Sequence, residues 1–540
     1  MLSLKDWQNN AAEFKNAGVE LPEFDVEKVK ENGKNAPVWI HFGGGNLYRG
    51  FHSEIGQRLA NAGKMNAGIV VCETLGDEIV RDVYQPFHND FLEVVMHGDG
   101  TLDKRVIAVT ADSLFANPAN EAGFAKAVGY FQNPALQFTT FSITEKGYAV
   151  KDSKGNLSTA AEQDIKNPPE QARLTMGIVA NLLYQRYQAG AYPIAMVSTD
   201  NFSQNGLRFQ ESILTIAEGW VKGGRAEQGF VDYLQDPQKV SFPWSMIDRI
   251  TPNPSESVEK VLEKDGFTDV KIYHSARGSN FASFSNTEEV HYLVIEDRFP
   301  NGRLPLDEAG VILTDRETVD KADTMKVTTC LNPLHTALAV TGCLLDYHAI
   351  SAEMKDADLV GLIKGIGYQE GLPVVSDPGI IDPKQFIDEL LTKRLPNPYI
   401  PDTPQRIASD TSQKVGIRYG ETIKKYVAAP DKKAADLTFI PLAIAAWLRY
   451  LLAVDDQGKP FTPSPDPLLS ELQAQLGAIK LGTQDPAKIH EAVQGILANQ
   501  MIFGSDLYQD GLGEKIEGLL QEMLAGVGAV RRTIHKYVAK

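Results

Sequence analysis

Four short apolar runs in the first half of the chain most strongly limit how it can fold. They span residues 37–42, 68–72, 138–144 and 194–198 and are rich in β-branched and aromatic residues. Each run is apolar at successive positions, as strands are when helices cover both faces of a parallel sheet. Patterns of helical periodicity separate the runs. Because strand and helix alternate, the sequence predicts an α/β fold with a doubly wound parallel sheet.

The second half of the chain has a different pattern. Helical periodicity dominates from about Asp307 onward, as in residues 336–340. We place the domain boundary in the turn-rich segment 299–302. This division predicts a first domain of residues 1–300 with extensions and a mainly α-helical second domain of residues 301–540.

Two further segments bear on the architecture. A strand-rich patch, residues 270–273 with residues 291–295, either joins the predicted sheet or forms a small extension. The most apolar stretch, residues 437–454, contains Pro441 and Arg449 and is at the lower length limit of a membrane span. We interpret this stretch as a buried core helix, and we expect no membrane association.

Charge and cysteine content exclude several classes of function. The 53 Lys and Arg residues stand against 70 Asp and Glu, a net charge of −17. A nucleic-acid-binding protein needs a basic face, so we expect no nucleic-acid partner. The three cysteines, Cys72, Cys330 and Cys343, fit neither a disulfide framework nor a zinc knuckle. The cysteines therefore lead us to expect no metal. The sequence has no apolar signal segment near Met1, so we expect a cytoplasmic protein. The oligomeric state stays open, and a monomer is compatible with the sequence.

A glycine-rich loop follows the first apolar run. Residues 43–50 read GGGNLYRG, and a helical pattern through Ile55 and Leu59 comes next. Glycines let the backbone approach a pyrophosphate, and a helix N-terminus supplies free N–H groups and a positive dipole end. Tyr48 stands where the GxGxxG pattern has its third glycine, so the motif departs from that pattern. The context predicts a Rossmann-type dinucleotide site, and a plain strand–helix turn is the alternative.

Glu73 is the acidic residue at the end of the second apolar run. A carboxylate there bonds the ribose hydroxyls and repels a 2′-phosphate, which favours NAD over NADP, although Lys64 lies nearby in the sequence. We therefore predict NAD as the cofactor. The predicted cofactor contacts are Gly43, Gly44, Gly45, Asn46, Leu47, Arg49 and Glu73.

An enzyme that oxidises an alcohol with NAD needs a group that takes the hydroxyl proton, supplied by zinc, by Tyr/Lys or by His/Asp. The sequence has no cluster of zinc ligands, but Lys326 lies in an apolar setting shortly before Asn332 and His335. Asn332 and His335 are neighbours on a helix face because they are three residues apart. A structural interpretation is the alternative, with Asn332 as the helix cap before Pro333 and His335 as a core histidine.

The chain resembles the polyol-specific long-chain dehydrogenase/reductase family, the mannitol dehydrogenase family. The resemblance rests on motifs that keep their order over most of the chain, at residues 43–50, 143–148, 200–206, 242–252, 295–297 and 326–335. It implies a metal-independent, NAD-dependent dehydrogenase that acts on a secondary alcohol. An NAD-binding regulatory protein is the alternative from another class, and such a protein would be expected to lose the base or the oxyanion donors.

The same resemblance implies roles for five residues. Lys326 is the general base, and Asn201 and Asn332 form an oxyanion hole around the reacting oxygen. His335 orients the substrate. Glu145 matches a glutamate thought to help the proton reach solvent, and a loop carboxylate without this role is the alternative.

One spacing departs from the family pattern. The asparagine usually follows the lysine by five residues, whereas Asn332 follows Lys326 by six. A π-bulge or a non-helical approach to Asn332 absorbs one additional residue. We therefore expect a helix irregularity between Lys326 and Asn332.

Arg406 and Lys414 match family positions that contact the substrate, and two cations suit a carboxylate. Asp248 and Arg249 are further candidate substrate contacts, with Arg249 as a third positive group, although a structural salt bridge between these two residues is equally compatible. Enzymes that act on uncharged mannitol carry the same Arg/Lys pair, so the pair alone does not identify the substrate.

The extended segment 265–286 and the form of residues 331–335 resemble the fructuronate reductase (mannonate oxidoreductase) branch of the family most. This resemblance implies a sugar-acid substrate, with D-fructuronate and NADH converted to D-mannonate and NAD. The alternatives are the interconversion of mannitol and fructose by a mannitol 2-dehydrogenase, or a tagaturonate reductase. A phosphorylated substrate is disfavoured because the sequence has no second phosphate loop.

Overall fold

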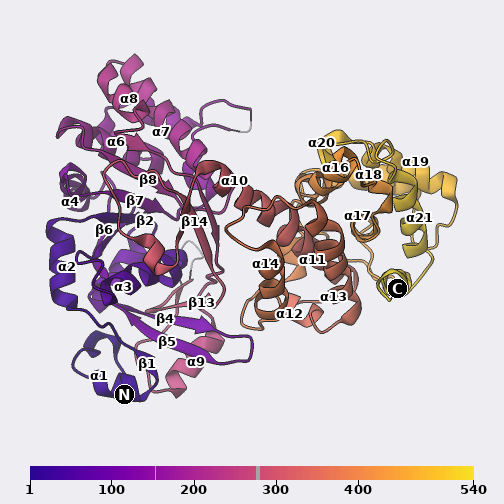
Figure 1. Cartoon of the computed structure of the whole chain (residues 1–540), viewed down its shortest axis with the longest axis horizontal. Coiled ribbons are helices and arrows are strands. Elements are labelled where there is room, and N and C mark those ends of the chain that lie inside the picture. Colours follow the sequence, from indigo (N-terminus) through magenta and orange to yellow (C-terminus); the bar gives the residue numbers. More distant parts are fainter. Residues whose placement is uncertain (153, 275–279, 540) are drawn as a thin grey trace. The chain divides into compact units, whose positions relative to one another are not determined.

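The computed structural model describes residues 1–152, 154–274 and 280–539, which form two compact units (Figure 1). The first unit comprises Met1–His97 and Thr101–Asp320, and the second comprises Gly98–Gly100 and Lys321–Lys540. The units divide after Asp320 rather than near residue 300. The reason is that β15 (Ile312–Thr314) pairs in parallel with β14 (Tyr292–Glu296), which keeps this strand with the first unit.

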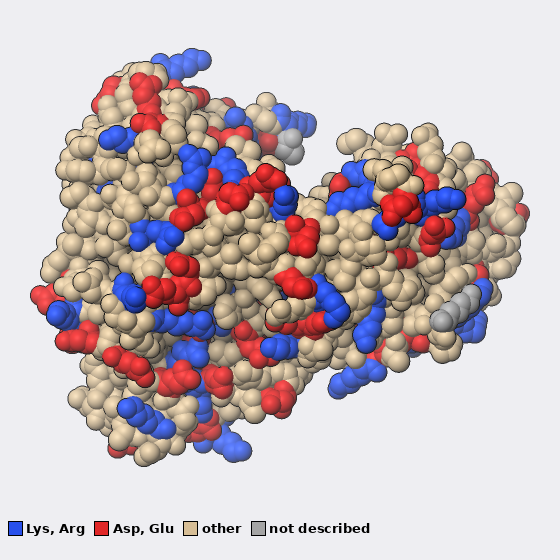
Figure 2. All heavy atoms as spheres, viewed as in Figure 1, with Lys and Arg blue, Asp and Glu red and all other residues tan. Residues whose placement is uncertain are grey.

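Charged side chains of both signs are interspersed over the face shown in Figure 2. Many charged side chains of the described residues form ion pairs, such as Arg303 with Asp297 at 2.8 Å and Lys104 with Asp265 at 2.6 Å.

A six-stranded parallel sheet forms the centre of the first unit, with the strand order β6-β3-β2-β7-β8-β9. Its strands are β2 (Trp39–Phe42), β3 (Ile69–Glu73), β6 (Thr110–Phe115), β7 (Phe138–Phe141), β8 (Ile194–Ser198) and β9 (Val240–Ser241). The four apolar runs are β2, β3, β7 and β8, so these predicted strands and their parallel pairing are confirmed. The sequence did not predict β6 and β9.

Helices cover both faces of this sheet. Ile40 and Phe42 of β2 pack with Phe131 of α4 on one face, whereas Trp39 of β2 packs with Leu59 of α3 on the other. The predicted doubly wound fold is therefore confirmed. The helices of the first unit are α1 (Ala11–Asn16), α2 (Val26–Asn35), α3 (Ser53–Asn61), α4 (Glu121–Gln132), α5 (Thr159–Lys166), α6 (Thr175–Gln188), α7 (Asn205–Lys222), α8 (Gln228–Gln235) and α9 (Glu256–Lys264).

The strand order reverses between β2 and β7, which are neighbours in the sheet. The chain goes from β2 to β3 on one side and from β7 to β8 on the other. In open parallel sheets, the carboxyl ends of the strands at such a reversal border the ligand-binding crevice. The glycine loop follows β2, so it lies at this position.

The remaining strands form three smaller sheets. They are β1 (Val19–Glu20), β4 (Phe91–Met96), β5 (Leu102–Ile107) and β13 (Phe284–Glu288) in one sheet, β10 (Ser245–Asp248), β14 and β15 in another, and β11 (Tyr273–His274) with β12 (Asn280–Phe281) in the third. The strand-rich patch of the sequence thus includes β14, which extends a separate sheet and does not join the six-stranded one. Residues 275–279 of the extended segment 265–286 lie outside the described residues.

The second unit is built from helices, because every named strand precedes Asp320. The chain enters it through α10 (Arg316–Met325), and its helices are α11 (Asn332–Leu344), α12 (Ile350–Glu353), α13 (Ala357–Lys364), α14 (Pro383–Glu389), α15 (Pro404–Ile407), α16 (Glu421–Ala428), α17 (Phe439–Leu451), α18 (Leu469–Gln475), α19 (Pro486–Leu497), α20 (Gln500–Phe503), α21 (Gly513–Met523) and α22 (Ala529–Val538). The predicted helical second domain is confirmed. The apolar stretch forms α17, in which all residues after Phe439 are buried, as expected of a core helix. None of the helices in the described residues is long and apolar enough to cross a membrane.

Glu353, at the end of α12, is a buried carboxyl group in the second unit. Neither Oε1 nor Oε2 has a hydrogen-bond partner, and the group packs against the backbone of α11 at Gly342, where a Cβ atom would lie 2.3 Å from Oε1. Burial, together with the negative charge of Asp356, raises the pKa of Glu353 to about 9. The carboxyl group is therefore protonated at neutral pH in the folded chain.

Replacing this acid should change how stability depends on pH. Because the folded pKa of Glu353 is raised, the unfolded chain releases this proton near pH 4.5 while the folded chain keeps it until about pH 9. Glu353 therefore lowers stability progressively as pH rises between these values, by up to about 1.4 kcal/mol per pH unit. Glu353→Gln should raise the thermal midpoint above that of the wild type most strongly at pH 8–9. The exposed Glu491→Gln is the control, and equal pH slopes for wild type and Glu353→Gln would contradict the assignment.

Candidate functional site

Close packing explains two of the glycines in the loop after β2. Gly43 has a φ of +99°, and a Cβ atom there would lie 2.2 Å from the carbonyl oxygen of Ser142. A Cβ atom on Gly44 would come within 2.9 Å of side-chain atoms of Tyr84 and Val71. In contrast, Gly45 faces open space. The backbone at this end of β2 is therefore bare on one side, as the approach of a pyrophosphate requires.

The helix that follows the loop presents its N-terminus at the same place. It begins at Asn46, passes through a π-helical turn (Tyr48–His52) and continues as α3. The N–H groups in the first turn of a helix have no partner within the helix and attract anions. The structure thus places Gly45, Asn46 and Leu47 where a dinucleotide phosphate can be bound.

Arg49 differs from the expectation that it contacts the cofactor. Its side chain is fully buried, and Nη1 donates to the carbonyl oxygen of Ala282 at 2.6 Å. Nη2 donates to Oδ1 of Asn46 at 2.9 Å. Arg49 therefore orients Asn46 and ties the loop to a distant segment, and its guanidinium does not face a ligand.

Glu73 ends β3 and lies directly beside the loop. The backbone N–H of Gly44 donates to Oε1 of Glu73 at 2.6 Å. Burial raises the pKa of Glu73 to about 7, despite the opposing effect of this hydrogen bond. Lys64 is paired with Glu308 at 3.1 Å, so its charge is already compensated. A bare glycine backbone, a helix N-terminus and a carboxylate at the second strand fit a dinucleotide with unmodified ribose hydroxyls.

Asp200, after β8, clamps the turn after β7. Its carboxylate accepts hydrogen bonds from the N–H of Ile143 at 2.9 Å, the N–H of Thr144 at 2.8 Å and the hydroxyl of Tyr148 at 2.7 Å. Thr144 has φ 64° and ψ 158°, a conformation that a β-branched residue rarely adopts. The clamp holds this strained residue at the carboxyl end of β7, next to candidate residue Glu145. Candidate residue Asn201 follows Asp200 directly and is exposed.

The strain at Thr144 can be measured. Thr144→Gly should be more stable than Thr144→Ala by about 1 kcal/mol, because glycine adopts this conformation freely but loses more entropy on folding. Denaturant unfolding of the two variants provides the comparison. If the alanine variant is as stable as the glycine variant, the backbone at residue 144 is not strained.

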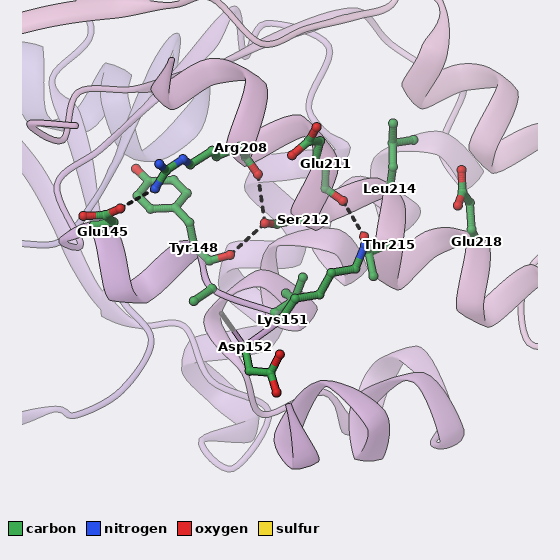
Figure 3. A pocket seen from close by; sticks show the side chains of 12 residues that line it. Glu145, Tyr148, Lys151, Asp152, Arg208, Glu211, Ser212, Leu214, Thr215 and Glu218 are labelled. Atoms are coloured by element: carbon green, nitrogen blue, oxygen red, sulfur yellow. Dashed lines mark hydrogen bonds and ion pairs between the residues drawn. The ribbon is translucent and has the colours of Figure 1, made fainter. Parts of the chain in front are cut away.

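Glu145 lies on the wall of a surface cavity of about 620 Å³ (Figure 3). It forms an ion pair with Arg208 of α7, and the two side chains are 60% and 53% exposed. The cavity is also lined by Tyr148, Lys151 and Glu211. The structure thus places Glu145 at the protein surface with a cationic partner.

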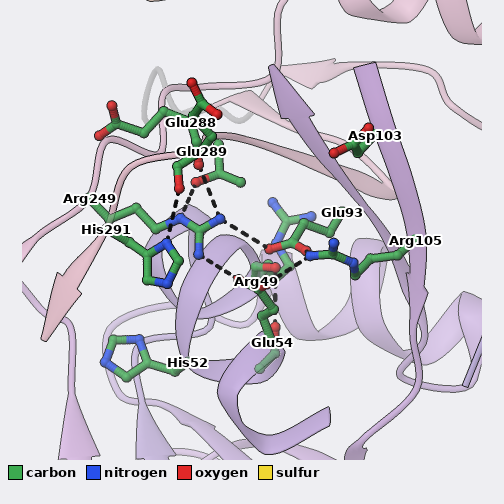
Figure 4. Close-up of polar contacts among 12 residues, drawn as sticks. Arg49, His52, Glu54, Glu93, Asp103, Arg105, Arg249, Glu288, Glu289 and His291 are labelled. Carbon is green, nitrogen blue, oxygen red and sulfur yellow. Dashed lines mark hydrogen bonds and ion pairs between the residues drawn. The ribbon is translucent and has the colours of Figure 1, made fainter. Parts of the chain in front are cut away.

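Arg249 and Asp248 lie at the end of β10, and Arg249 belongs to a buried ionic cluster (Figure 4). Its Nη1 pairs with Oε2 of Glu54 at 2.5 Å, and its Nε donates to Oγ1 of Thr287 at 2.6 Å. The side chain of Arg249 is 2% exposed. The charge of Arg249 is compensated within the fold, so the expectation that Arg249 offers a third positive group to the substrate is not supported. Arg249 forms a structural salt bridge instead, but its acidic partner is Glu54 and not Asp248.

Breaking this cluster should destabilise the first unit. Arg249→Met leaves Glu54 buried with one cation fewer, which should lower the free energy of unfolding by about 3–5 kcal/mol. The exposed Arg81→Met is the control and should change stability little. Similar thermal midpoints for the two variants would show that the cluster does not hold the fold together.

The second unit contains the Lys326 motif. Residues Lys326–Cys330 form a π-helical turn in which the N–H of Leu331 donates to the carbonyl oxygen of Lys326 at 3.0 Å. Helix α11 then begins at Asn332. The π turn accommodates the additional residue, so the expected helix irregularity is confirmed. The Lys326 side chain is 1% exposed and lies 3.4 Å from Asp323.

His335 lies one turn after Asn332 among several cations. Burial, together with the charges of Arg418, Arg394 and Arg406, lowers the pKa of His335 to about 3. The imidazole is therefore neutral at physiological pH and can accept or donate a hydrogen bond. Its Nε2 lies 3.6 Å from Oδ2 of Asp402.

The two predicted substrate cations already have partners. Arg406 forms an ion pair with Asp402, and Nζ of Lys414 donates to the carbonyl oxygen of Ser409 at 2.6 Å. Sequence reasoning missed Arg394 and Arg418, although Arg418 follows Lys414 by four residues. That spacing, one helical turn, is the signal that could have identified it.

No group of three or more His, Cys, Asp or Glu side chains within residues 1–152, 154–274 and 280–539 is arranged to hold a metal ion. The three cysteines are free and buried.

Comparisons with known proteins agree with this architecture. The family model of the mannitol dehydrogenase Rossmann domain matches residues 38–308, and that of the mannitol dehydrogenase C-terminal domain matches residues 318–524. The crystal structure of a D-sorbitol dehydrogenase in substrate-free form has a TM-score of 0.79 at 24% identity and covers 95% of this chain and 97% of that one. A Pseudomonas fluorescens mannitol 2-dehydrogenase ternary complex with NAD and D-mannitol has a TM-score of 0.70 at 24% identity, with 97% of each chain covered.

Curated relatives extend the likeness to sequence. A D-mannonate oxidoreductase of Thermotoga maritima is 48% identical over 98% of this chain and 97% of its own length. A polyol:NADP oxidoreductase of Gluconobacter oxydans is 27% identical over 85% of this chain and 88% of its own. The two family models together match well over half of the sequence, and the chain is an oxidoreductase that belongs to the mannitol dehydrogenase family.

Proposed function

We propose that this chain is an NAD-dependent oxidoreductase that interconverts D-mannonate and D-fructuronate. The observation that carries the proposal is the 48% identity, over 98% of the chain, to the Thermotoga maritima D-mannonate oxidoreductase. The cations gathered around His335 support a negatively charged substrate, because arginine binds carboxylates in a bidentate manner.

The cofactor proposal rests on the first unit. Gly45 faces open space and leaves room for the pyrophosphate, the helix that begins at Asn46 contributes N–H donors, and Glu73 would accept hydrogen bonds from the ribose hydroxyls. When bound, NAD accepts the hydride of the alcohol carbon, and NADH returns it. Glu73 disfavours a 2′-phosphate, so we expect NAD to be preferred although one relative is named for NADP.

We further propose that the residues carry the roles that the family resemblance implies. Lys326 takes the hydroxyl proton as hydride leaves the carbon, and in the reverse direction its ammonium group donates this proton to the carbonyl oxygen. The amide groups of Asn201 and Asn332 donate hydrogen bonds to that oxygen. Neutral His335 orients the substrate, and Glu145 exchanges the proton with solvent.

Mannitol oxidation to fructose is the second candidate. Arg406 is already paired with Asp402, and a neutralised arginine suits a hydroxyl better than a carboxylate. Tagaturonate, a further keto-uronate, differs from fructuronate only in stereochemistry and is tested alongside it.

The absorbance of NADH at its characteristic band tests these candidates directly. Purified enzyme should oxidise NADH with D-fructuronate, more slowly with D-tagaturonate and D-fructose, and more slowly with NADPH in place of NADH. A preference for D-fructose would overturn the sugar-acid proposal. No turnover with any of them, despite NADH binding, would favour an NAD-binding regulatory protein.

Lys326→Met should lower turnover by about 10²- to 10⁴-fold, the usual contribution of general acid–base catalysis. NADH binding, followed by cofactor fluorescence, should persist because the cofactor contacts are proposed to lie in the first unit. Lys364→Met, an exposed lysine on α13, is the matched control. A near-normal turnover number for Lys326→Met would refute the role of the lysine as base.

A further inference from the structure

The cations around His335 are not equally compensated. Arg406 is paired with Asp402, and Lys414 donates to the carbonyl oxygen of Ser409 while its Nζ lies 4.0 Å from Asp410. In contrast, Arg418 forms no ion pair with any Asp or Glu in the described part of the chain. Burial lowers the pKa of its guanidinium to about 10, with only Tyr419 acting in the opposite direction.

Arg418 is positioned next to the Lys326 motif. It lies in the π-helical turn Gly416–Gly420, which packs against both the π turn of Lys326 and α11. Its Nη1 donates to the hydroxyl of Thr336, which in turn donates to the carbonyl oxygen of Asn332 at 2.8 Å. The guanidinium therefore sits beside the first turn of α11, where Asn332 and His335 lie.

Two buried arginines of the first unit, Arg186 and Arg249, donate hydrogen bonds from all three of their guanidinium nitrogens. Arg186 makes five hydrogen bonds, all to backbone carbonyl oxygens, and Arg249 bonds to Glu54, Thr287 and the carbonyl oxygen of Glu288. A guanidinium carries five N–H donors, and Arg418 uses only the one bond to Thr336 within the described residues. A partly buried charge whose donors lack partners lowers the stability of the folded chain unless an anion binds to it.

We propose that Arg418 binds the carboxylate of the sugar-acid substrate and is the residue that makes the enzyme select an acid over a neutral polyol. Arg406 and Lys414, whose charges are already engaged, contact substrate hydroxyl groups instead. This inference rests on the proposed function, because it names the group that recognises the charged end of that substrate.

The experiment compares a charged with a neutral substrate. In steady-state assays, Arg418→Met should raise the KM for D-mannonate at least 10-fold with a smaller change in kcat, whereas kcat/KM for D-mannitol should stay equal or increase. Arg418→Lys keeps the charge and should recover part of the affinity. Lys424→Met, which removes an exposed cation of the neighbouring α16, is the matched control and should leave both substrates unaffected.

Arg418→Gln guards against misfolding, because its amide can still donate to Thr336 while the charge is lost. It should reproduce the selective loss of D-mannonate binding. The inference is overturned if the methionine and glutamine variants bind D-mannonate within twofold of the wild type, or if they lose D-mannonate and D-mannitol equally.

Calorimetric titration of D-mannonate into the enzyme with NAD separates this inference from the proposed function. Wild-type binding that depends on Arg418 but gives no turnover would contradict only the proposed function. Turnover of D-mannonate that does not depend on Arg418 would contradict only the inference. No wild-type binding at all would contradict both.

Discussion

The parallel pairing of β2 with both β3 and β7 is the constraint on which the arrangement of the first unit depends. It places the glycine loop at the point where the strand order reverses, and it brings Glu73 at the end of β3 into hydrogen-bonding distance of Gly44. The same alignment of strand ends lets Asp200, after β8, hold the turn after β7. Candidate residues that are far apart in sequence are thus gathered at one edge of the sheet because parallel strands end together.

Buried charge divides into two groups with different consequences. Arg186 and Arg249 are satisfied by oxygen atoms of the chain, and Arg49 is bonded through Nη1 and Nη2, so these arginines serve the fold. Arg418 has one hydrogen bond and no ion pair within the described residues, and the carboxyl oxygens of Glu353 have no hydrogen-bond partner. Glu353 keeps its proton, whereas an arginine cannot lose its charge at physiological pH and needs an anion from outside the chain.

Much of the fold could be predicted from local patterns. Continuous apolar runs identified four strands. A one-residue difference from the family spacing predicted a helix irregularity between Lys326 and Asn332, which the structure shows to be a π-helical turn. Strand β6 escaped prediction because it carries Asp112 and Ser113, whose polarity hides it from an apolar pattern. In the structure Tyr130 donates to Asp112 at 2.7 Å, a tertiary contact that no local pattern indicates.

The candidate site was less predictable, because the use of an ionic side chain depends on its partners. Arg49 and Arg249 stand in motifs that indicate ligand contact, yet their partners within the fold, Ala282 and Glu54, lie about two hundred residues away in sequence. Arg418 was overlooked for the converse reason, since only the structure shows that it lacks an acid. The most direct measurement is a crystal structure of the enzyme with NAD and D-mannonate. Our account predicts the substrate carboxylate at hydrogen-bonding distance from the Arg418 guanidinium, and a carboxylate bound elsewhere, with a hydroxyl group or only water at Arg418, would contradict it.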